Sequence, residues 1–387
     1  MRFYDFSQDY KKVRFGDEFK LFRGSSPRPI IDFISNNPKD PFWIKIGDMP
    51  ENGYIVKNIT EHISIEGSKK SRAVYKGDMI LSNSMSFGKP YILDLDGFIH
   101  DGWFVIRNYE KSFDRDYLRH LLASPSVQKR YLQIASGGVV LNISSDLVNS
   151  VSVNIPCIAE QRKISNFLNL LDTRIQTQNK IIEHYESLIK TIIDSKIYNL
   201  NNERESLKTY ASLKNGYAFK SENYSENGQY KIITIGNVTG DQYISDKTNN
   251  IDKIPSDIQR HQILKTNDIL VSLTGNVGRV SMVNSDNCLL NQRVGLIQIN
   301  NIEFRNYIYV VLNSQIFERE MINKSQGAAQ LNIGKNDIEN YKIPKPTKNN
   351  LEIAKLIDRY LAKLLIEKRI LELYQDEKNY LLCNLFI

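Results

Sequence analysis

The chain has few of the residues from which small domains build covalent or metal frameworks. Among its 387 residues it has three cysteines, Cys157, Cys288 and Cys383, which are odd in number and far apart. This argues against a disulfide framework and against a zinc ribbon. The five histidines are equally scattered, and no HExxH or CxxC motif occurs. We therefore expect no metal site.

Long apolar runs are also missing. The sequence holds no stretch of about 18 apolar residues, so we expect no transmembrane helix and no membrane partner. The first residues, MRFYDFSQDYKK, lack the apolar core of a signal peptide. With a hydrophobic fraction of 41% and a charged fraction of 25%, the composition is that of a folded protein, which we expect in the cytoplasm.

Motifs for catalysis are missing as well. The sequence has no GxxxxGK[ST] phosphate loop, no dinucleotide fingerprint, no Asn-Pro-Pro-Tyr run and no nuclease carboxylate pattern. The segment from Thr274 to Gly278 is only a GxxG, which is usually a turn, and Asp101 beside His100 is more often a structural polar group. We expect a recognition or scaffold protein that is not an enzyme and binds no cofactor itself.

The balance of charge is mildly basic. There are 51 Lys and Arg residues against 44 Asp and Glu, which gives a net charge of +7. This is compatible with a polyanion such as DNA, although many proteins of this charge bind no nucleic acid.

An internal repeat organises the chain. Asp78 and Asp268 are 190 residues apart, and the same offset relates Gly88 to Gly278, Ser124 to Ser314 and Pro156 to Pro346. It holds from residue 76 to residue 156 of the first copy, and near the start it drifts by one or two, so that Gly24 pairs with Gly216. We interpret this as a duplication that produced two related domains in tandem.

Each copy has the same expected order of elements. Short β-branched runs bounded by Gly, Asn and Asp predict strands, and one helix follows in each copy, at 115–131 and 305–323. The fold class is therefore α+β. We expect domains at residues 1–155 and 201–346, with a long helix after each, at 156–200 and 347–387.

The two long helices carry apolar residues in steps of four and three. The first seam runs from Ile164 to Lys196 and the second from Ile353 to Leu385, and their polar interruptions, Gln178 and Glu367, correspond. This heptad pattern predicts coiled-coil helices. An intramolecular pair satisfies both seams, and the helices could pair either way round. The alternatives are that each helix packs on its own domain or forms a dimer.

The candidate recognition surfaces repeat with the domains. Loops 82–89 and 272–279 follow equivalent strands and mix small residues, amides and one closing cation, which suit phosphates and base edges. The segments 100–103 and 291–293 also correspond, and a small basic cluster lies at 69–72. The predicted DNA-binding residues are Lys69, Lys70, Arg72, Ser82, Asn83, Ser84, Lys89, Trp103, Ser272, Thr274, Asn276, Arg279, Asn291, Gln292, Arg293 and Gln330.

Two arginines receive different roles. Arg293 corresponds to Trp103 in the first copy, and because this position varies we expect Arg293 to read a base. Arg279 corresponds to another cation, Lys89, so we expect it to contact phosphate. Domains that share a frame and differ in their loops suggest two readers of two different sequences.

The pattern resembles the specificity (S) subunit of type I restriction–modification systems. The resemblance is carried by the stretch Ile155-Pro-Cys-Ile-Ala-Glu160-Gln161-Arg-Lys-Ile164, then by Leu168, Leu171 and Asp172, and by a Leu-Asn-Ile run before each Ile-Pro stretch. The second helix departs from it, since Asn350-Leu-Glu-Ile353 lacks the Glu-Gln pair.

This resemblance implies a function. Each domain would read one half of a bipartite DNA site, and an antiparallel coiled coil, with a pseudo-twofold relation between the halves, would set the spacing. Two methyltransferase (M) subunits, which bring S-adenosylmethionine, would dock on the helices near Glu160, Gln161, Arg162 and Asp172. Restriction (R) subunits could join. The alternatives are a duplicated scaffold that binds two protein partners without DNA, and a DNA-binding protein without a methyltransferase.

Overall fold

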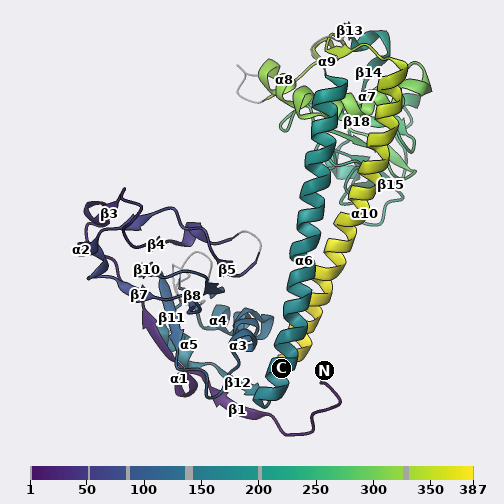
Figure 1. The fold of residues 1–387 in the computed structure, drawn as a ribbon. Helices are drawn as coiled ribbons and strands as arrows, with labels where there is room; N and C mark the ends of the chain where they lie inside the picture. Colours follow the sequence, from purple (N-terminus) through teal and green to yellow (C-terminus); the bar gives the residue numbers. More distant parts are fainter. Residues whose placement is uncertain are drawn as a thin grey trace. The chain divides into compact units, whose positions relative to one another are not determined.

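A computed structural model describes residues 2–50, 53–83, 88–135, 143–198, 203–325 and 331–386. The chain divides into two compact units. Unit 1 comprises Met1–Asn179 and Ile370–Ile387, and unit 2 comprises Lys180–Arg369. Each unit therefore contains one α+β domain and parts of both long helices (Figure 1).

Unit 1 is built on a five-stranded sheet and a three-stranded sheet. The first has the strand order β2 (Lys20–Arg23), β11 (Trp103–Arg107), β8 (Met79–Ser82), β9 (Pro90–Leu93) and β5 (Ile55–Val56). The second has the order β4 (Trp43–Ile44), β10 (Gly97–Ile99) and β7 (Arg72–Val74). Two short pairs complete the unit, β1 (Lys11–Arg14) with β12 (Ser152–Ile155) and β3 (Ile34–Ser35) with β6 (His62–Ile63).

Unit 2 repeats this plan. One sheet has the order β14 (Ala211–Asn215), β21 (Val294–Ile299), β18 (Ile269–Ser272) and β19 (Val280–Met282). The other has the order β16 (Asn249–Ile251), β15 (Tyr230–Ile233), β20 (Cys288–Leu290) and β17 (Ile263–Leu264). A short pair joins β13 (Arg204–Ser206) to β22 (Lys342–Pro344).

The strand pairings confirm the duplication. In both units the long strand, β11 or β21, lies between the first strand and the hairpin formed by the next two. In both second sheets the central strand pairs parallel with one neighbour, β4 or β15, and antiparallel with another, β7 or β17. The two segments have the same mixture of parallel and antiparallel pairings, so the offset in the sequence reflects one shared fold.

The helix after the sheets differs from expectation, because each predicted helix is two. In unit 1 these are α3 (Arg115–Ala123) and α4 (Pro125–Ala135), and in unit 2 they are α7 (Arg305–Leu312) and α8 (Gln315–Ser325). The repeated serines cause the break. Ser124 accepts a hydrogen bond from the amide of Val127, and Ser314 accepts one from Phe317, so each hydroxyl caps a new helix start.

Each unit also contains shorter helical segments. Unit 1 contains α1 (Phe15–Glu18), α2 (Ile65–Ser68), α5 (Ser145–Ser150) and the 3₁₀ turns η1 (Ile30–Phe33) and η2 (Ile46–Asp48). Unit 2 contains α9 (Lys335–Glu339) and the 3₁₀ turns η4 (Leu207–Thr209), η5 (Ser221–Asn223), η6 (Arg260–Gln262) and η7 (Ile302–Phe304). Helices α5 and α9 stand at equivalent places, directly before β12 and β22.

The long helices are α6 (Ile158–Ile192) and α10 (Lys348–Leu385), and they form an antiparallel coiled coil. Within unit 1, the start of α6 lies beside the end of α10 (Figure 1). There Leu168 and Leu171 of α6 share a core with Leu381 and Leu385 of α10. Within unit 2, the later part of α6 meets the earlier part of α10. There the Tyr185 and Tyr360 rings lie 6.2 Å apart, and Lys368 pairs with Glu186 at 3.1 Å.

The expected first seam ends differently in the structure. Residues Ile193–Ile197 form a π-helical turn, η3, at the end of α6. Ile193 and Ile197 are buried, whereas the predicted seam residue Lys196 is exposed. A π turn holds more residues than an α turn, so it rotates the apolar stripe past the heptad position.

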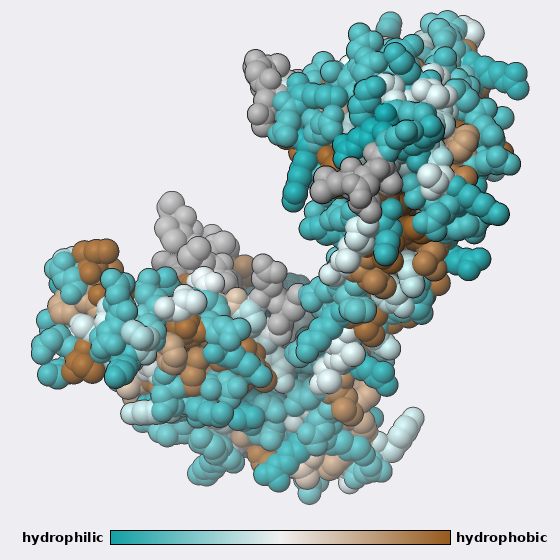
Figure 2. All heavy atoms as spheres, turned by 45° about the horizontal axis from the view of Figure 1, so that its top comes forward, coloured by the Kyte–Doolittle hydropathy of each residue, from teal (hydrophilic) through white to brown (hydrophobic). Residues whose placement is uncertain are grey.

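Hydrophilic residues cover most of the face shown in Figure 2, and apolar residues gather in smaller areas on each unit. Among the described residues, no helix is long and apolar enough to cross a membrane. The same part of the chain holds no cluster of three or more His, Cys, Asp or Glu side chains suited to a metal ion.

Candidate nucleic-acid interface

Three distant segments converge at one place in each unit. In unit 1 the amide of Asn83, at the end of β8, donates to the carbonyl of Gly102 at 3.0 Å, and its carbonyl accepts from Ile143 at 2.8 Å. In unit 2 the amide of Leu273 donates to Arg293 at 3.0 Å, and its carbonyl accepts from Ile333 at 2.9 Å. The structure thus joins the two predicted recognition loops of each domain to the end of its Leu-Asn-Ile run.

A fourth segment reaches the same place through a glycine. A Cβ atom on Gly24 would lie 1.9 Å from the carbonyl oxygen of His100, and one on Gly216 would lie 2.1 Å from that of Asn291. No side chain fits so close to backbone, so glycine is required at both sites. The sequence pairing of Gly24 with Gly216 therefore reflects one shared contact, which brings β2 and β14 to the recognition loops.

The two hairpin loops close in the same way. The Ser82 hydroxyl accepts a hydrogen bond from the amide of Lys89 at 3.1 Å, and the Ser272 hydroxyl accepts one from Arg279 at 3.0 Å. Gly88 and Gly278 have left-handed φ angles of +68° and +80°. Both serines are fully buried. This corrects their predicted role, because Ser82 and Ser272 hold the loops closed and do not face a ligand.

The remaining loop residues differ in exposure. Asn276 and Lys89 are exposed, and the Lys89 ammonium lies 5.1 Å from the centre of the Tyr91 ring. Arg279 is half-exposed and pairs with Glu318 at 3.5 Å. Thr274 is half-buried. The predicted residues Ser84 and Gln330 lie outside the described residues.

Two predicted asparagines are buried and support the loops from inside. The Asn83 amide donates to the carbonyl of Asp101 at 2.8 Å. The Asn291 side chain accepts from the backbone of Arg293 at 3.2 Å. This corrects the prediction of base contacts for Asn83 and Asn291. By contrast Gln292 and Arg293, which follow Asn291, are both exposed.

The structure corrects the prediction for Trp103. Its side chain has no exposed surface and packs in the core with Tyr91, at 5.9 Å between ring centres. Trp103 stands opposite Ser82 in the sheet, whereas the residue opposite Ser272 is Val294. The offset between the copies is therefore 191 here, and the counterpart of Arg293 is Gly102. A one-residue shift turns a strand residue to the other face, so the pairing of Trp103 with Arg293 was wrong.

The basic cluster of unit 1 is larger than the sequence indicated. Lys69, Lys70 and Arg72 are exposed, and Arg72 Nε donates to the carbonyl of Arg23 at 3.1 Å. Arg23 Nε in turn donates to the carbonyl of Asp101 at 3.2 Å. Arg23 also lines a hollow of about 590 Å³ at the convergence of the loops. Arg23 directly precedes the repeated Gly24, and this position in the sequence could have identified it as a candidate DNA-binding residue.

The residues expected to bind a partner lie mostly inside unit 1. Glu160 is fully buried and receives two hydrogen bonds from Arg2, at 3.1 and 3.0 Å. Gln161 is also fully buried. Its side chain accepts from the amide of Asp114 at 2.9 Å and donates to the carbonyls of Ser112 and Pro156. This corrects the prediction for both residues, because they join the first helix to its own domain.

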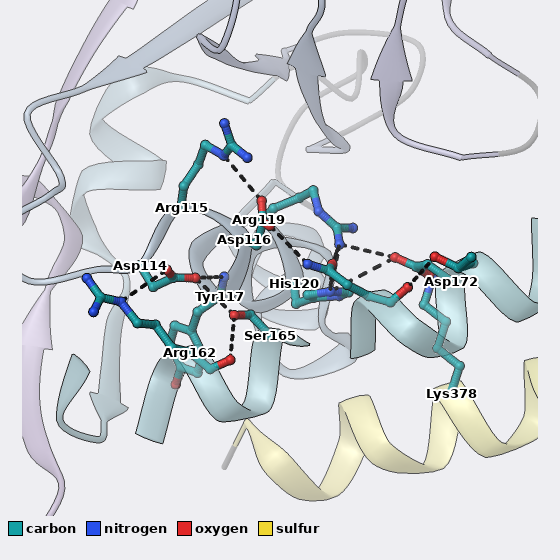
Figure 3. Close-up of polar contacts among 12 residues, drawn as sticks. Asp114, Arg115, Asp116, Tyr117, Arg119, His120, Arg162, Ser165, Asp172 and Lys378 are labelled. Carbon is teal, nitrogen blue, oxygen red and sulfur yellow. Dashed lines mark hydrogen bonds and ion pairs between the residues drawn. The ribbon is translucent and has the colours of Figure 1, made fainter. Parts of the chain in front are cut away.

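Asp172 stands in a buried polar network between α3, α6 and α10 (Figure 3). Its carboxylate lies 3.1 Å from Arg119 and 2.6 Å from Lys378. Burial, with the Arg119 charge beside it, lowers the pKa of His120 to about 3, so the imidazole is neutral. Arg162 alone of the four predicted residues is exposed, 3.9 Å from Asp114.

The start of the second long helix, which lacks the Glu-Gln pair, differs in its surroundings from the start of the first. The counterpart of Gln161, Asn350, is also buried. Glu160 pairs with a segment at the N-terminus of the chain, whereas in unit 2 the chain before the domain is the end of α6 itself. There Tyr198, directly after η3, donates to the carbonyl of Val311 in α7 at 3.1 Å and so joins the end of α6 to the second domain.

A family model for the type I restriction modification DNA specificity domain matches residues 7–186 and 201–373. Among curated proteins, the type I restriction enzyme MjaVIII specificity subunit of Methanocaldococcus jannaschii is 22% identical over 96% of this chain and 90% of that protein. The HindI specificity subunit of Haemophilus influenzae is 28% identical over 48% of this chain and 40% of that protein.

Solved structures show the same fold. The S subunit of a type I restriction–modification system from M. genitalium superposes with a TM-score of 0.65 at 16% identity, over 98% of this chain and 96% of that one. A chain from a structure on complex assembly and conformational transition of a type I system has a TM-score of 0.55 at 15% identity, with 97% of each chain covered.

Proposed function

The chain belongs to the family of type I restriction–modification DNA specificity domains, and on that premise we propose that it recognises DNA for such a complex. Each of its two α+β domains reads one half of a bipartite site. The chain itself is not an enzyme. The cytoplasm, where the DNA lies, is its place of action.

One observation carries this proposal: an identical frame presents different side chains at equivalent places. The convergence of three segments is the same in both units, down to the hydrogen bond between Asn83 and Gly102 in one and between Leu273 and Arg293 in the other. Yet unit 1 has the half-buried Asp101 and the buried Gly102 there, whereas unit 2 has the exposed Gln292 and Arg293. Direct reading of bases depends on side-chain donors and acceptors, so the two domains suit two different sequences.

The charges divide the work within each domain. Exposed cations, such as Lys70, Arg72 and Lys89, flank the place where the segments converge. They suit phosphates and give affinity without sequence preference. Gln292 and Arg293 project from the loop itself and suit adenine and guanine edges respectively. In this arrangement phosphate contacts position the domain and the loop side chains specify the bases.

The partners follow from the same premise. Two M subunits dock on the long helices, bring S-adenosylmethionine and transfer its methyl group to adenine, and R subunits join where the system also cuts. Methylation requires the adenine to leave the stack, which is work for the M subunit. Because Glu160, Gln161 and Asp172 are buried, the docking surface lies on exposed residues such as Arg162. The coiled coil sets the spacing between the half-sites.

The test is the DNA motif that the chain specifies. Methylation across the genome is sequenced with the natural chain and with a chimaera in which residues 1–155 come from a relative. We expect one half of the methylated motif to change and the other half to stay. A change in both halves would contradict separate reading. Filter binding of the chain to DNA is measured with and without an M subunit. A chain that binds two proteins but shows no affinity for DNA in either case would support the scaffold instead.

A further inference from the structure

A second hollow, in unit 2, lies beside the proposed recognition loop. It has a volume of about 680 Å³, within the roughly 300–1,000 Å³ of small-molecule sites. Its lining includes the aromatic residues Tyr217, Phe219 and Tyr224. The backbone of Tyr217 is hydrogen-bonded to the loop on both sides, since its amide donates to Leu290 at 2.8 Å and its carbonyl accepts from Gln292 at 2.9 Å.

We propose that this hollow receives one base of the second half-site after that base has left the duplex stack. The inference rests on the proposed function and adds a contact to it. The residues that line the hollow come from the segment that follows β14 and includes η5, and from the end of β16 and the turn after it, none of which the sequence pattern had marked.

The aromatic residues supply a stacking surface. The rings of Tyr217 and Phe219 meet edge to face, with centres 4.9 Å apart and planes at 62°. Phe219 is half-buried, and one part of it packs on the small core of Ile232, Ile251 and Leu289. A ring that is fixed on a core and remains partly open to a hollow is well suited to an unpaired base, because every base has an apolar face.

The polar residues suit the base better than its phosphate. Lys220 and Lys253 are balanced by Glu222 and Asp252 in the lining, and Lys220 already pairs with Glu222 at 3.7 Å. A site for phosphate would need an excess of cations. Carboxylates beside lysines instead offer both acceptors and donors, which match the amino and carbonyl groups on a base edge.

Unit 1 has different residues at the equivalent place. Ser25, whose amide donates to the carbonyl of Ile99 at 3.2 Å, corresponds to Tyr217. The serine side chain provides no stacking surface, and its hydroxyl donates to the carbonyl of Lys70 at 3.1 Å. Unit 1 therefore has no ring at the position of Tyr217, and the proposal concerns the half-site read by unit 2.

The experiment places 2-aminopurine at each position of the second half-site in turn. The full chain, assembled with its methyltransferase, is added to each duplex, and the fluorescence and the affinity are measured. We expect a severalfold rise at one position besides the methylated adenine. In Phe219→Leu, which keeps an apolar side chain on the core, the rise at that position should disappear and affinity for the motif should fall about tenfold.

Phe304→Leu is the matched control. Phe304 is also half-buried and pairs edge to face with a tyrosine, Tyr210, at 5.1 Å, but it lies outside the hollow. This variant should keep both the signal and the affinity. A rise confined to the methylated adenine, or an unchanged second rise in Phe219→Leu, would overturn the inference while the reading of two half-sites stands. Equal affinity for the motif and for unrelated DNA would overturn the proposed function with it.

Discussion

Neutralising Asp172 should destabilise unit 1 selectively. The carboxylate is almost fully buried, with 7% of the side chain exposed, and it lies between Arg119, which is 4% exposed, and Lys378, which is 28% exposed. In Asp172→Asn the shape is kept and the negative charge is lost, so Arg119 becomes a buried cation without its carboxylate. Removing one partner of a buried ion pair typically costs about 3–5 kcal/mol.

The surroundings of Arg119 and Lys378 indicate a loss of stability at the lower end of that range. Lys378 can turn to water, and Arg119 keeps a hydrogen bond to Asn169 at 2.8 Å and its place over the Tyr54 ring, at 3.4 Å from the ring centre. We therefore expect the free energy of unfolding to fall by about 3 kcal/mol. For a unit of this size that corresponds to a fall in Tm of about 6–12 °C.

Tryptophan fluorescence can follow unit 1 alone. The two tryptophans of the chain, Trp43 and Trp103, are both buried in unit 1, so the unfolding of unit 2 contributes no tryptophan signal. The control is Glu186→Gln, which removes an exposed ion pair in unit 2 and should leave the tryptophan transition unchanged.

Replacing the network by apolar residues gives a second, sharper comparison. Arg119→Met combined with Asp172→Leu should recover more than half of the lost stability, because neither buried charge then remains. A loss below about 1 kcal/mol in Asp172→Asn, or no recovery in the double variant, would refute the reasoning that this pair is held by its charges.

Four further predictions concern pH, DNA contacts and spacing. Because the pKa of His120 is lowered to about 3, the unfolded chain takes up a proton below pH ~6.5 that the folded chain does not. Stability should therefore fall by about 2 kcal/mol between pH 7 and pH 5, and His120→Asn should remove most of that slope in urea titrations of the tryptophan signal. Arg293→Ala should relax specificity in the second half-site, whereas Arg279→Ala should weaken binding to all sequences and lower the salt slope by about one. Both variants are titrated on cognate and on substituted duplexes, and a uniform loss of affinity in both would contradict the base-reading role of Arg293. Since Glu318 pairs with Arg279 at 3.5 Å, Glu318→Gln should strengthen binding to every sequence a few-fold, and an unchanged affinity would indicate that Arg279 does not reach phosphate. One heptad inserted near Thr177 and one near Ile366 should lengthen the spacer in the methylated motif. Loss of either half-motif in a folded chain would contradict the proposal that the coiled coil sets the spacing.

Patterns that recur along the chain were enough to predict the architecture. The offset near 190 predicted two α+β domains, and the strand pairings confirm them. The steps of four and three predicted the coiled-coil helices, because a helix that must bury one stripe repeats its apolar residues at that period. These features are periodic or repeated, so one sequence contains more than one copy of the evidence for each.

The exposure of single residues could not be predicted in this way, because contacts between distant segments decide it. Glu160 is buried by Arg2, 158 positions away, and a one-residue shift between the copies turns Trp103 into the core while its neighbour Gly102 stands where Arg293 does. The aromatic hollow beside Gln292 likewise gathers residues from 217 to 255. By itself the sequence determined that there are two similar readers joined by two helices. Only the tertiary structure decided which side chains each reader shows to solvent, because that choice depends on strand register and on long-range packing.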